Sequence, residues 1–515
     1  MSKANSLDRP PSAAAARSRL VRDASGYMAA TYVSQVLAFG IGVLIKGLLG
    51  PTDLGIWTML LAILSFLGLL EFGVIQAANK EISYALSKGD KAEAERFKRV
   101  QFSFVALTSV LGTVGMIAYA LWTRSGNDAL TLGMLAVALI LPISQLHMGQ
   151  VTVYWANQLF SKTSLLIVAE TVLTGTLGLF LVWRFGVAGQ VAAFLLIVLV
   201  KIGALAWPAR DQPQLKIGFA WDLQVLQHLL KAGVPLFLVS VSNVLKVSGT
   251  IFLISHFFGT ESVGFYALAL SVQNFIYWTP NAFSIVMFPR FQARYADSND
   301  QAAALRSYLV KPIQGLVFFL LPLLLSAAYF IVPVLIDHAL PAYRPTIVVL
   351  TVMLPGTFFL SLEHMPAQFL TTTNRHWQRV TISLLSLLLV ALCTVAAVQI
   401  SESLLSFVTG ISVAYFLAFM LAFQYAIHHA KGPRSDRWLG LMMTGAFLYL
   451  AVIVVLVDGF VAASHGSWQI DLTVAFGKWL LCILLLVPVF IVAERQLELL
   501  STLGNLCRNL VKRKT

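Results

Sequence analysis

Apolar runs of about twenty residues alternate with short polar connections along the whole chain. A helical run of this length crosses the roughly 30 Å of hydrocarbon in a bilayer. Fourteen such runs can be placed between the polar connections. They cover 27–49, 53–79, 100–122, 131–156, 163–183, 187–206, 232–257, 262–289, 311–333, 346–370, 380–398, 404–427, 438–457 and 472–493. The pattern predicts an all-α, polytopic membrane protein with fourteen transmembrane helices.

Basic residues gather on one side of this predicted topology. Most of the 36 Lys and Arg residues lie in the two tails and in connections such as 88–99, 290–294 and 431–437. The connections of the opposite side hold Arg124, Arg184 and Arg344. By the positive-inside rule, both termini are cytoplasmic and the protein is a multi-pass protein of the cell inner membrane. The same asymmetry accounts for much of the net charge of +13, so no nucleic acid is needed as a partner.

Composition supports a membrane protein and gives no sign of an enzyme. The chain is 58% hydrophobic and 11% charged, whereas a soluble domain is about 25% charged. No nucleophile–base motif, phosphate-binding glycine loop or segment long enough for an ATPase is present, and Cys393, Cys482 and Cys507 are scattered. We expect a transporter with no metal or cofactor, driven by a coupling H⁺ or Na⁺, by the membrane potential, or by consumption of product.

The spans and tails predict six segments. A basic cytoplasmic tail (1–26) precedes an N-lobe of six spans (27–206) and an amphipathic cytoplasmic linker (207–231). A C-lobe of six spans (232–428), two further spans (429–493) and an amphipathic basic tail (494–515) follow. Trp221, Leu226 and Leu229 share one side of the linker, so we expect the linker to lie on the inner membrane surface.

Two predicted turns have glycines at matching positions. LIKGLLGPTDLGIWTML (44–60) aligns with LISHFFGTESVGFYALA (253–269), which places Gly50 on Gly259 and Gly55 on Gly264. Gly50 can end a helix in the left-handed conformation, and a proline directly after it cannot continue that helix. One turn joins spans 1 and 2 and the other joins spans 7 and 8. An offset of six helices preserves orientation and predicts two parallel six-helix repeats.

Several segments resemble the prokaryotic polysaccharide flippases of the multidrug/oligosaccharidyl-lipid/polysaccharide (MOP) exporter superfamily. They are LGPTDLGIW (49–57), LLEFGVIQAANKEIS (69–83), VWRFGVAGQVAAFLL (182–196) and WDLQVLQHLLKAGVPLFL (221–238). The resemblance covers spans 1 to 8 and becomes generic afterwards. It implies V-shaped N- and C-lobes plus two extra C-terminal helices.

The resemblance also implies an activity and partners. The family moves an undecaprenyl-pyrophosphate-linked oligosaccharide, such as an O-antigen or exopolysaccharide repeat unit, from the cytoplasmic to the periplasmic face by alternating access. Besides this substrate and the bilayer, the expected partners are a polysaccharide polymerase and chain-length machinery, and the expected state is a monomer.

Cations within spans are the first candidates for binding the phosphates of such a substrate, because intramembrane charges usually face an aqueous cavity. Lys246 lies near the centre of span 7, with Asn243 one helical turn earlier. The alternative for Lys246 is a structural pair with a glutamate of another span. Lys46 and Lys478 lie near the outer ends of spans 1 and 14, so snorkelling to the surface is an alternative for both.

Amides and aromatic rings of span 8 are candidates for sugar binding. In QNFIYWTPN (273–281), Gln273, Asn274 and Tyr277 fall on one helix face, and Trp278 adjoins them. Amides hydrogen-bond sugar hydroxyls and aromatic rings cover sugar faces. The alternative is hydrogen bonding between helices and ordinary packing.

Acids within spans are the candidates for ion coupling. Glu71, Glu170 and Glu363 lie in spans 2, 5 and 10, and His364 directly follows Glu363. Each carboxylate could bind a coupling H⁺ or Na⁺, or could instead tie one helix to another.

Three other functions stay open at this point. A flippase of the peptidoglycan precursor also has fourteen spans, but we would expect several arginines in its cavity. A drug–cation antiporter of the same superfamily usually has twelve spans and an acidic cavity. A membrane enzyme or scaffold is disfavoured by the short outer connections.

Overall fold

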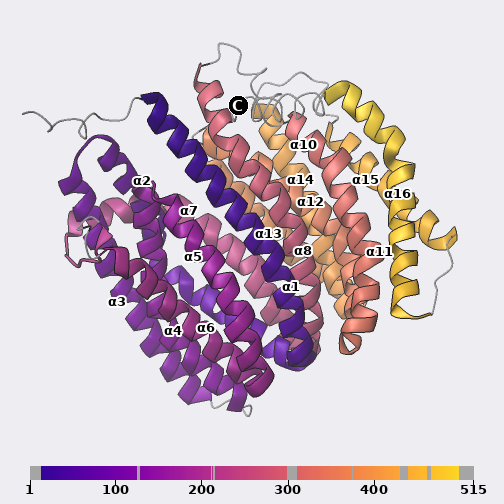
Figure 1. The fold of residues 1–515 in the computed structure, drawn as a ribbon, viewed down its shortest axis with the longest axis horizontal. Coiled ribbons are helices and arrows are strands. Elements are labelled where there is room, and N and C mark those ends of the chain that lie inside the picture. Colours follow the sequence, from indigo (N-terminus) through magenta and orange to yellow (C-terminus); the bar gives the residue numbers. More distant parts are fainter. Residues whose placement is uncertain are drawn as a thin grey trace, which may run out of the picture. The chain divides into compact units, whose positions relative to one another are not determined.

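The computed structural model describes residues 13–123, 128–209, 212, 215–297, 310–373, 375–429, 439–460 and 466–497. Within these residues all regular structure is helical (Figure 1). Residues 1–12 and 498–515 of the two predicted tails, and Cys507 with them, lie outside the described part of the chain.

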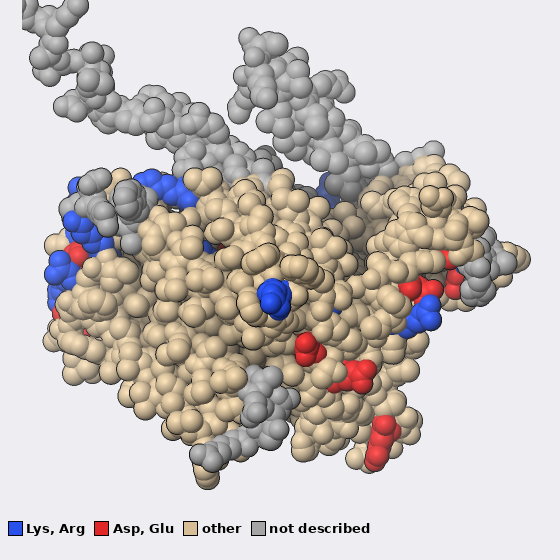
Figure 2. Space-filling view, turned by 60° about the horizontal axis from the view of Figure 1, so that its bottom comes forward, with Lys and Arg blue, Asp and Glu red and all other residues tan. Residues whose placement is uncertain are grey.

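The described helices are long and apolar enough to make this a multi-pass membrane protein. Eleven helical segments in the described residues meet the length and hydropathy of a membrane span. Many of their large apolar side chains are exposed, as a lipid-facing surface requires. The face drawn in Figure 2 is accordingly almost free of charge over most of its area. The predicted all-α, polytopic architecture is confirmed.

Three of the eleven segments are too long for a single crossing. They are Ala30–Glu71, Lys162–Leu205 and Leu223–Pro280, and the shortest has 42 residues, which is about 63 Å of helix, or twice the hydrocarbon thickness. Each is interrupted by a glycine with positive φ, at Gly50 (76°), Gly186 (57°) and Gly259 (83°). The number of membrane crossings depends on whether the chain turns back at each of these breaks. The count of fourteen transmembrane helices therefore stays a prediction.

Helix packing divides the chain into two units. Unit 1 comprises residues up to Leu49 and Ile56–Val244, and unit 2 comprises Gly50–Gly55 and residues from Leu245 onward. Unit 1 contains α1 (Ala13–Gly68, apart from 50–55), the 3₁₀ turn η1 (Leu69–Glu71), α2 (Val74–Ser87), α3 (Lys91–Thr123), α4 (Asp128–Ala156), α5 (Phe160–Leu173), the π-helical turn η2 (Thr174–Gly178), α6 (Leu179–Ala209) and α7 (Leu223–Val244).

The core of unit 1 includes one end of α7. Leu226 and Leu229 are buried in a cluster with residues of α2, α3, α4 and α6. In the same cluster, the buried Tyr154 hydroxyl donates a 2.7 Å hydrogen bond to the carbonyl of Leu205. The apolar face predicted for the linker therefore packs on protein, whereas Trp221 is 60% exposed.

Asp222 begins α7 and fixes its first turn. Its carboxylate accepts the backbone N–H groups of Gln224 and Val225 and pairs with Arg96 of α3. The Arg96 guanidinium, followed by the two backbone donors, holds the pKa of Asp222 below its ordinary value. Residues 223–231 of the predicted linker are thus the first turns of a 22-residue helix.

Unit 2 is built around one heavily buried helix. It contains the π-helical turn η4 (Leu245–Gly249), α8 (Thr250–Asp297), α10 (Lys311–Gly315), the π-helical turn η6 (Leu316–Leu320), α11 (Leu321–Ala339), the 3₁₀ turn η7 (Pro341–Tyr343), α12 (Thr346–Thr372), α13 (His376–Ile400), α14 (Leu404–His429), α15 (Leu439–Phe460) and α16 (Trp468–Leu497). The segment Thr346–Thr371 of α12 has the largest buried share of any described candidate span. Packing of α8 and α14 against it positions the candidate site.

The two glycine turns predicted from sequence have matching conformations and touch each other. Gly50 (φ 76°, ψ 167°) and Gly259 (φ 83°, ψ 168°) occupy the same region of backbone space. A Cβ on Gly55 would lie 2.0 Å from the carbonyl oxygen of Thr260, and one on Gly264 would lie 1.9 Å from that of Pro51. The alignment that pairs the glycines also pairs Pro51 with Thr260. The contacts are therefore reciprocal between the two turns.

Candidate functional site

Lys246 lies on a π-helical turn and has no acidic partner in the described residues. Its side chain is 8% exposed, and its Nζ donates a 3.4 Å hydrogen bond to the hydroxyl of Ser386 on α13. Within the described part of the chain, no carboxylate lies within ion-pair distance of it. A buried ammonium that faces only a neutral hydroxyl is costly unless an anion joins it. π-helical turns are also frequent at functional sites.

Asn243 and Lys46 lie in different surroundings from Lys246. Asn243 is exposed, although it precedes Lys246 by only three residues. Lys46 is half-buried, and its Nζ would lie 3.8 Å from a Cβ on Gly42, one turn earlier on α1. The Lys46 ammonium therefore lies back along its helix, away from the Gly50 turn towards which snorkelling would draw it.

A cluster of polar and aromatic side chains joins α8, α12 and α13 within unit 2. The rings of Tyr277 and His364 meet edge to face, with centroids 6.2 Å apart, and His364 Nε2 lies 3.2 Å from Gln368 Nε2. Glu363 is half-buried and acts electrostatically on Tyr277. No hydrogen bond or ion pair of Glu363 occurs among the described residues, so its carboxylate keeps its acceptor capacity.

Arg379 belongs to this cluster, and the sequence reading did not find it. It falls between the predicted spans 346–370 and 380–398, so the sequence predicts a connection there, but α13 already begins at His376. Its guanidinium donates a 2.7 Å hydrogen bond to the Thr371 hydroxyl and acts electrostatically on Tyr277 and His364. The signal available in the sequence was its position directly before the apolar run that starts at Val380.

The candidates for sugar binding divide between buried and exposed positions. Gln273 is 4% exposed, and its amide oxygen accepts a 3.4 Å hydrogen bond from Thr357 of α12. Tyr277 is half-buried, whereas Asn274 and Trp278 are exposed. Gln273 thus ties two helices together, and the other three side chains are the ones that a ligand could reach.

Glu71 and Glu170 have structural partners in unit 1. Glu71 is 7% exposed and accepts the backbone N–H of Ile75 at 2.8 Å, which caps the start of α2. The predicted span 53–79 is interrupted there, since Phe72 and Gly73 both have positive φ. Glu170 of α5 pairs at 3.0 Å with Lys201 of α6, a cation that the sequence reading did not single out.

Gly73 has a second reason to be a glycine. A Cβ on Gly73 would lie 2.6 Å from the carbonyl oxygen of Gly233, and one on Gly233 would lie 2.6 Å from that of Gly73. The break in the second predicted span therefore allows α7 to approach at backbone distance.

Comparisons of the whole chain give a fold and a family. A multidrug resistance MATE family transporter of the MOP superfamily in an inward-facing conformation matches with a TM-score of 0.63 and 16% identity, over 78% of this chain and 94% of that one. A MOP superfamily transporter from Pyrococcus furiosus matches with a TM-score of 0.59 and 14% identity, over 79% and 95%. A mutant MATE transporter from Vibrio cholerae matches with a TM-score of 0.56 and 16% identity, over 81% and 99%.

The fold is therefore that of the MOP-type membrane transporters, as the resemblance found in the sequence implied. A family model described as "Polysaccharide biosynthesis protein" matches residues 45–340, which is more than half of the chain. The chain belongs to this polysaccharide biosynthesis protein family, a conclusion that agrees with the resemblance found in the sequence. Among curated proteins, none matches the sequence significantly.

Proposed function

We propose that this protein flips an undecaprenyl-pyrophosphate-linked oligosaccharide from the cytoplasmic to the periplasmic face of the inner membrane. Membership of a polysaccharide biosynthesis family with a transporter fold supports export of a glycan precursor. The observation that carries the proposal is Lys246, a buried cation whose one described partner is a serine hydroxyl. A pyrophosphate supplies the anion that this ammonium lacks.

The transport route in this proposal is alternating access across fourteen spans, with both termini cytoplasmic. The glycine breaks at Gly50, Gly186 and Gly259 support the count, because each divides a segment at least about twice as long as one crossing needs. The proposed N-lobe and C-lobe are the six-helix repeats predicted from sequence. Matching backbone conformations of the two glycine turns support that repeat.

The roles of the remaining residues follow from their surroundings. Asn274, Tyr277 and Trp278 are the proposed contacts for the sugars, because they are accessible and combine an amide with aromatic rings. Glu363, beside His364, is the proposed site for a coupling H⁺ or Na⁺, because its carboxylate has no described partner. Glu71 and Glu170 fit structural roles better, since one caps a helix and the other pairs with a lysine.

Two related functions are less well supported by the same residues. A drug–cation antiporter would place a buried, unpaired ammonium where its cationic substrate must pass, at a cost in Coulomb energy. A flippase of the peptidoglycan precursor would also need a phosphate site. Among the described residues, the cluster around Tyr277 includes a single arginine, Arg379, whereas we would expect several arginines in the site of that function.

The test is complementation of a strain that lacks its own polysaccharide flippase, at matched membrane expression. Wild type should restore surface polysaccharide, and Lys246→Met should lower it by tenfold or more, because a hydrogen bond to a charged group is worth about 1.5–3 kcal/mol and 1.4 kcal/mol is a factor of ten. Lys246→Arg should retain most activity. Lys201→Met is the matched control, because that lysine already has a carboxylate partner.

The outcomes separate the protein's function from the role of its lysine. Restoration by wild type and by Lys246→Met alike would keep the flippase and remove Lys246 from its mechanism. If wild type fails with several host glycans but supports a strain lacking its peptidoglycan-precursor flippase, the proposed substrate is wrong.

A further inference from the structure

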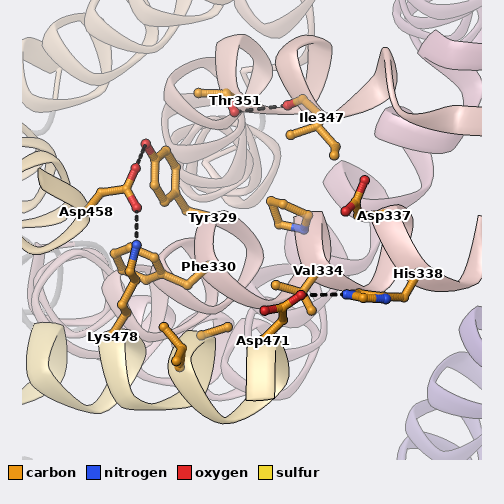
Figure 3. Close-up of a pocket in the computed structure, with 13 residues that line it drawn as sticks. Tyr329, Phe330, Val334, Asp337, His338, Ile347, Thr351, Asp458, Asp471 and Lys478 are labelled. Carbon is orange, nitrogen blue, oxygen red and sulfur yellow. Dashed lines mark hydrogen bonds and ion pairs between the residues drawn. The ribbon is translucent and has the colours of Figure 1, made fainter. Parts of the chain in front are cut away.

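A pocket lined by both charged and apolar side chains lies in unit 2, away from the cluster around Tyr277. Its volume is about 340 Å³, and four helices line it: Tyr329 to His338 of α11, Ile347 and Thr351 of α12, Asp458 of α15, and Asp471 to Lys478 of α16 (Figure 3). Small-molecule pockets are typically about 300–1,000 Å³ in volume. On the predicted topology, the pocket opens at the periplasmic ends of these helices.

The carboxylates of the pocket are held in place by fixed partners. Asp458 accepts a 2.7 Å hydrogen bond from Lys478, which is 8% exposed, and a 3.4 Å hydrogen bond from the Tyr329 hydroxyl (Figure 3). Asp471 lies 2.8 Å from His338 Nε2 and also accepts the backbone N–H of Gly466. Asp337 pairs with Arg344 at 2.6 Å. The three acids are therefore preorganised, each beside a basic side chain.

This arrangement favours a neutral, hydroxyl-rich ligand over an ion. Lys478 compensates Asp458 and Arg344 compensates Asp337, so two of the three carboxylates offer no free charge to a cation or an anion, and the third, Asp471, is engaged by His338 and the Gly466 N–H. No group of three or more metal-ligating side chains occurs in the described residues, here or elsewhere. A carboxylate has about four lone-pair directions, so Asp458 can still accept hydrogen bonds from a ligand after binding Lys478 and Tyr329.

The remaining walls suit the apolar faces of a sugar ring. Phe330, Pro333 and Val334 of α11 and Val474 of α16 line the pocket between the acids. Acceptors spaced around the pocket with apolar surface between them match a pyranose, whose hydroxyls project from its edge and whose C–H groups form its faces. The geometry points to a saccharide-binding subsite between α11, α12, α15 and α16. Its assignment rests on the proposed glycan function.

The subsite would act on the glycan after it reaches the periplasmic side. Three of its charged groups, Asp458, Asp471 and Lys478, come from the two helices predicted to be extra to the six-helix repeats. The solved transporters leave about a fifth of this chain uncovered, although 94–99% of their own length is matched. A glycan-holding role gives the added helices a function that a plain transporter fold lacks.

The test is saturation-transfer NMR on the full-length protein in lipid nanodiscs, which avoid sugar-based detergents. The probes are the neutral monosaccharides glucose, galactose, mannose, rhamnose and N-acetylglucosamine. The main variant is Thr351→Trp, which places an indole in the pocket from an exposed position. Thr409→Trp is its matched control, because both threonines are exposed and both donate to the carbonyl four residues earlier.

We expect transfer to at least one sugar in wild type, loss of that signal in Thr351→Trp, and an unchanged signal in Thr409→Trp. Asp458→Asn should weaken it, and Glu402→Gln, which changes an exposed acid outside the pocket, should not. No transfer in wild type, or equal transfer in wild type and Thr351→Trp, would overturn the inference. Complementation is read separately, so pocket-dependent binding without flipping would refute only the proposed function, and flipping without such binding would refute only the subsite.

Discussion

Gly264→Ala should destabilise the protein by forcing two backbones apart. A Cβ at this position would lie 1.9 Å from the carbonyl oxygen of Pro51 and 2.6 Å from its carbonyl carbon, whereas real contacts essentially never fall below 3.0 Å. The turn at Pro51 must therefore move by at least about 1 Å, and overpacking of this kind costs about 1–3 kcal/mol. The unfolding equilibrium should change by about 5- to 150-fold.

The assay is reversible unfolding of the purified protein in mixed micelles with increasing SDS. Gly445→Ala is the control, because that glycine is exposed on α15 with nothing within 4 Å of its Cβ position. It should be neutral or stabilising by up to about 1 kcal/mol, since alanine is the better helix former. Gly55→Ala should cost as much as Gly264→Ala, because a Cβ there meets the Thr260 carbonyl oxygen at 2.0 Å.

The double variant gives the sharper result. One outward shift of the two turns relieves both collisions, so Gly55→Ala with Gly264→Ala should cost less than the sum of the single changes. If Gly264→Ala is as stable as Gly445→Ala, the close approach of the two turns is not a feature of the folded protein. Full additivity would mean that the two contacts do not share one movement.

Two further predictions concern unit 1. Tyr154→Phe removes the hydrogen bond to the buried Leu205 carbonyl and should cost about 1 kcal/mol in the same unfolding assay; no loss of stability would mean that the bond contributes nothing. Asp222→Asn should destabilise at neutral pH, because Arg96 and the first turn of α7 favour the ionised carboxylate and lower its pKa. A group with a depressed folded-state pKa contributes fully above its unfolded pKa and loses that contribution as pH falls through the folded-state pKa. The difference from wild type should therefore begin to shrink near pH 3.8 and disappear only below the lowered pKa of Asp222. A difference that persists in stronger acid would contradict the ion-pair explanation.

The fold class and the positions of the two glycine turns could be predicted from the sequence. Apolar runs of spanning length depend only on composition, so the polytopic all-α architecture could be predicted without tertiary information. Gly50 and Gly259 could be paired because a glycine followed by helix-start residues is a local signal. Their positive φ was expected, but ψ values of 167° and 168° place both outside the left-handed helical conformation predicted for Gly50. The reciprocal collisions of Gly55 and Gly264 with the opposite turn are tertiary and could not be read from the chain.

The roles of the candidate site residues were harder to predict from the sequence, because each role depends on which side chain or backbone group the residue contacts in the fold. Lys246 and Glu170 both read as intramembrane charges, yet one faces a serine and the other a lysine. Glu71 read as part of a continuous span, but two residues with positive φ follow it and turn its carboxylate into a helix cap. Arg379 was missed because a helix start within a basic segment leaves no clear hydrophobic boundary.

The π-helical turn at Leu245–Gly249 has a consequence for how relatives should be compared. Such a turn holds one residue more than an α-helical turn, and one residue corresponds to about 100° of rotation. Asn243, just before this turn, is exposed, and Lys246, within it, is buried. In a homologue that lacks the extra residue, an alignment by position would match side chains that face in different directions. At this point in the chain, a one-residue deletion is a larger structural change than most substitutions.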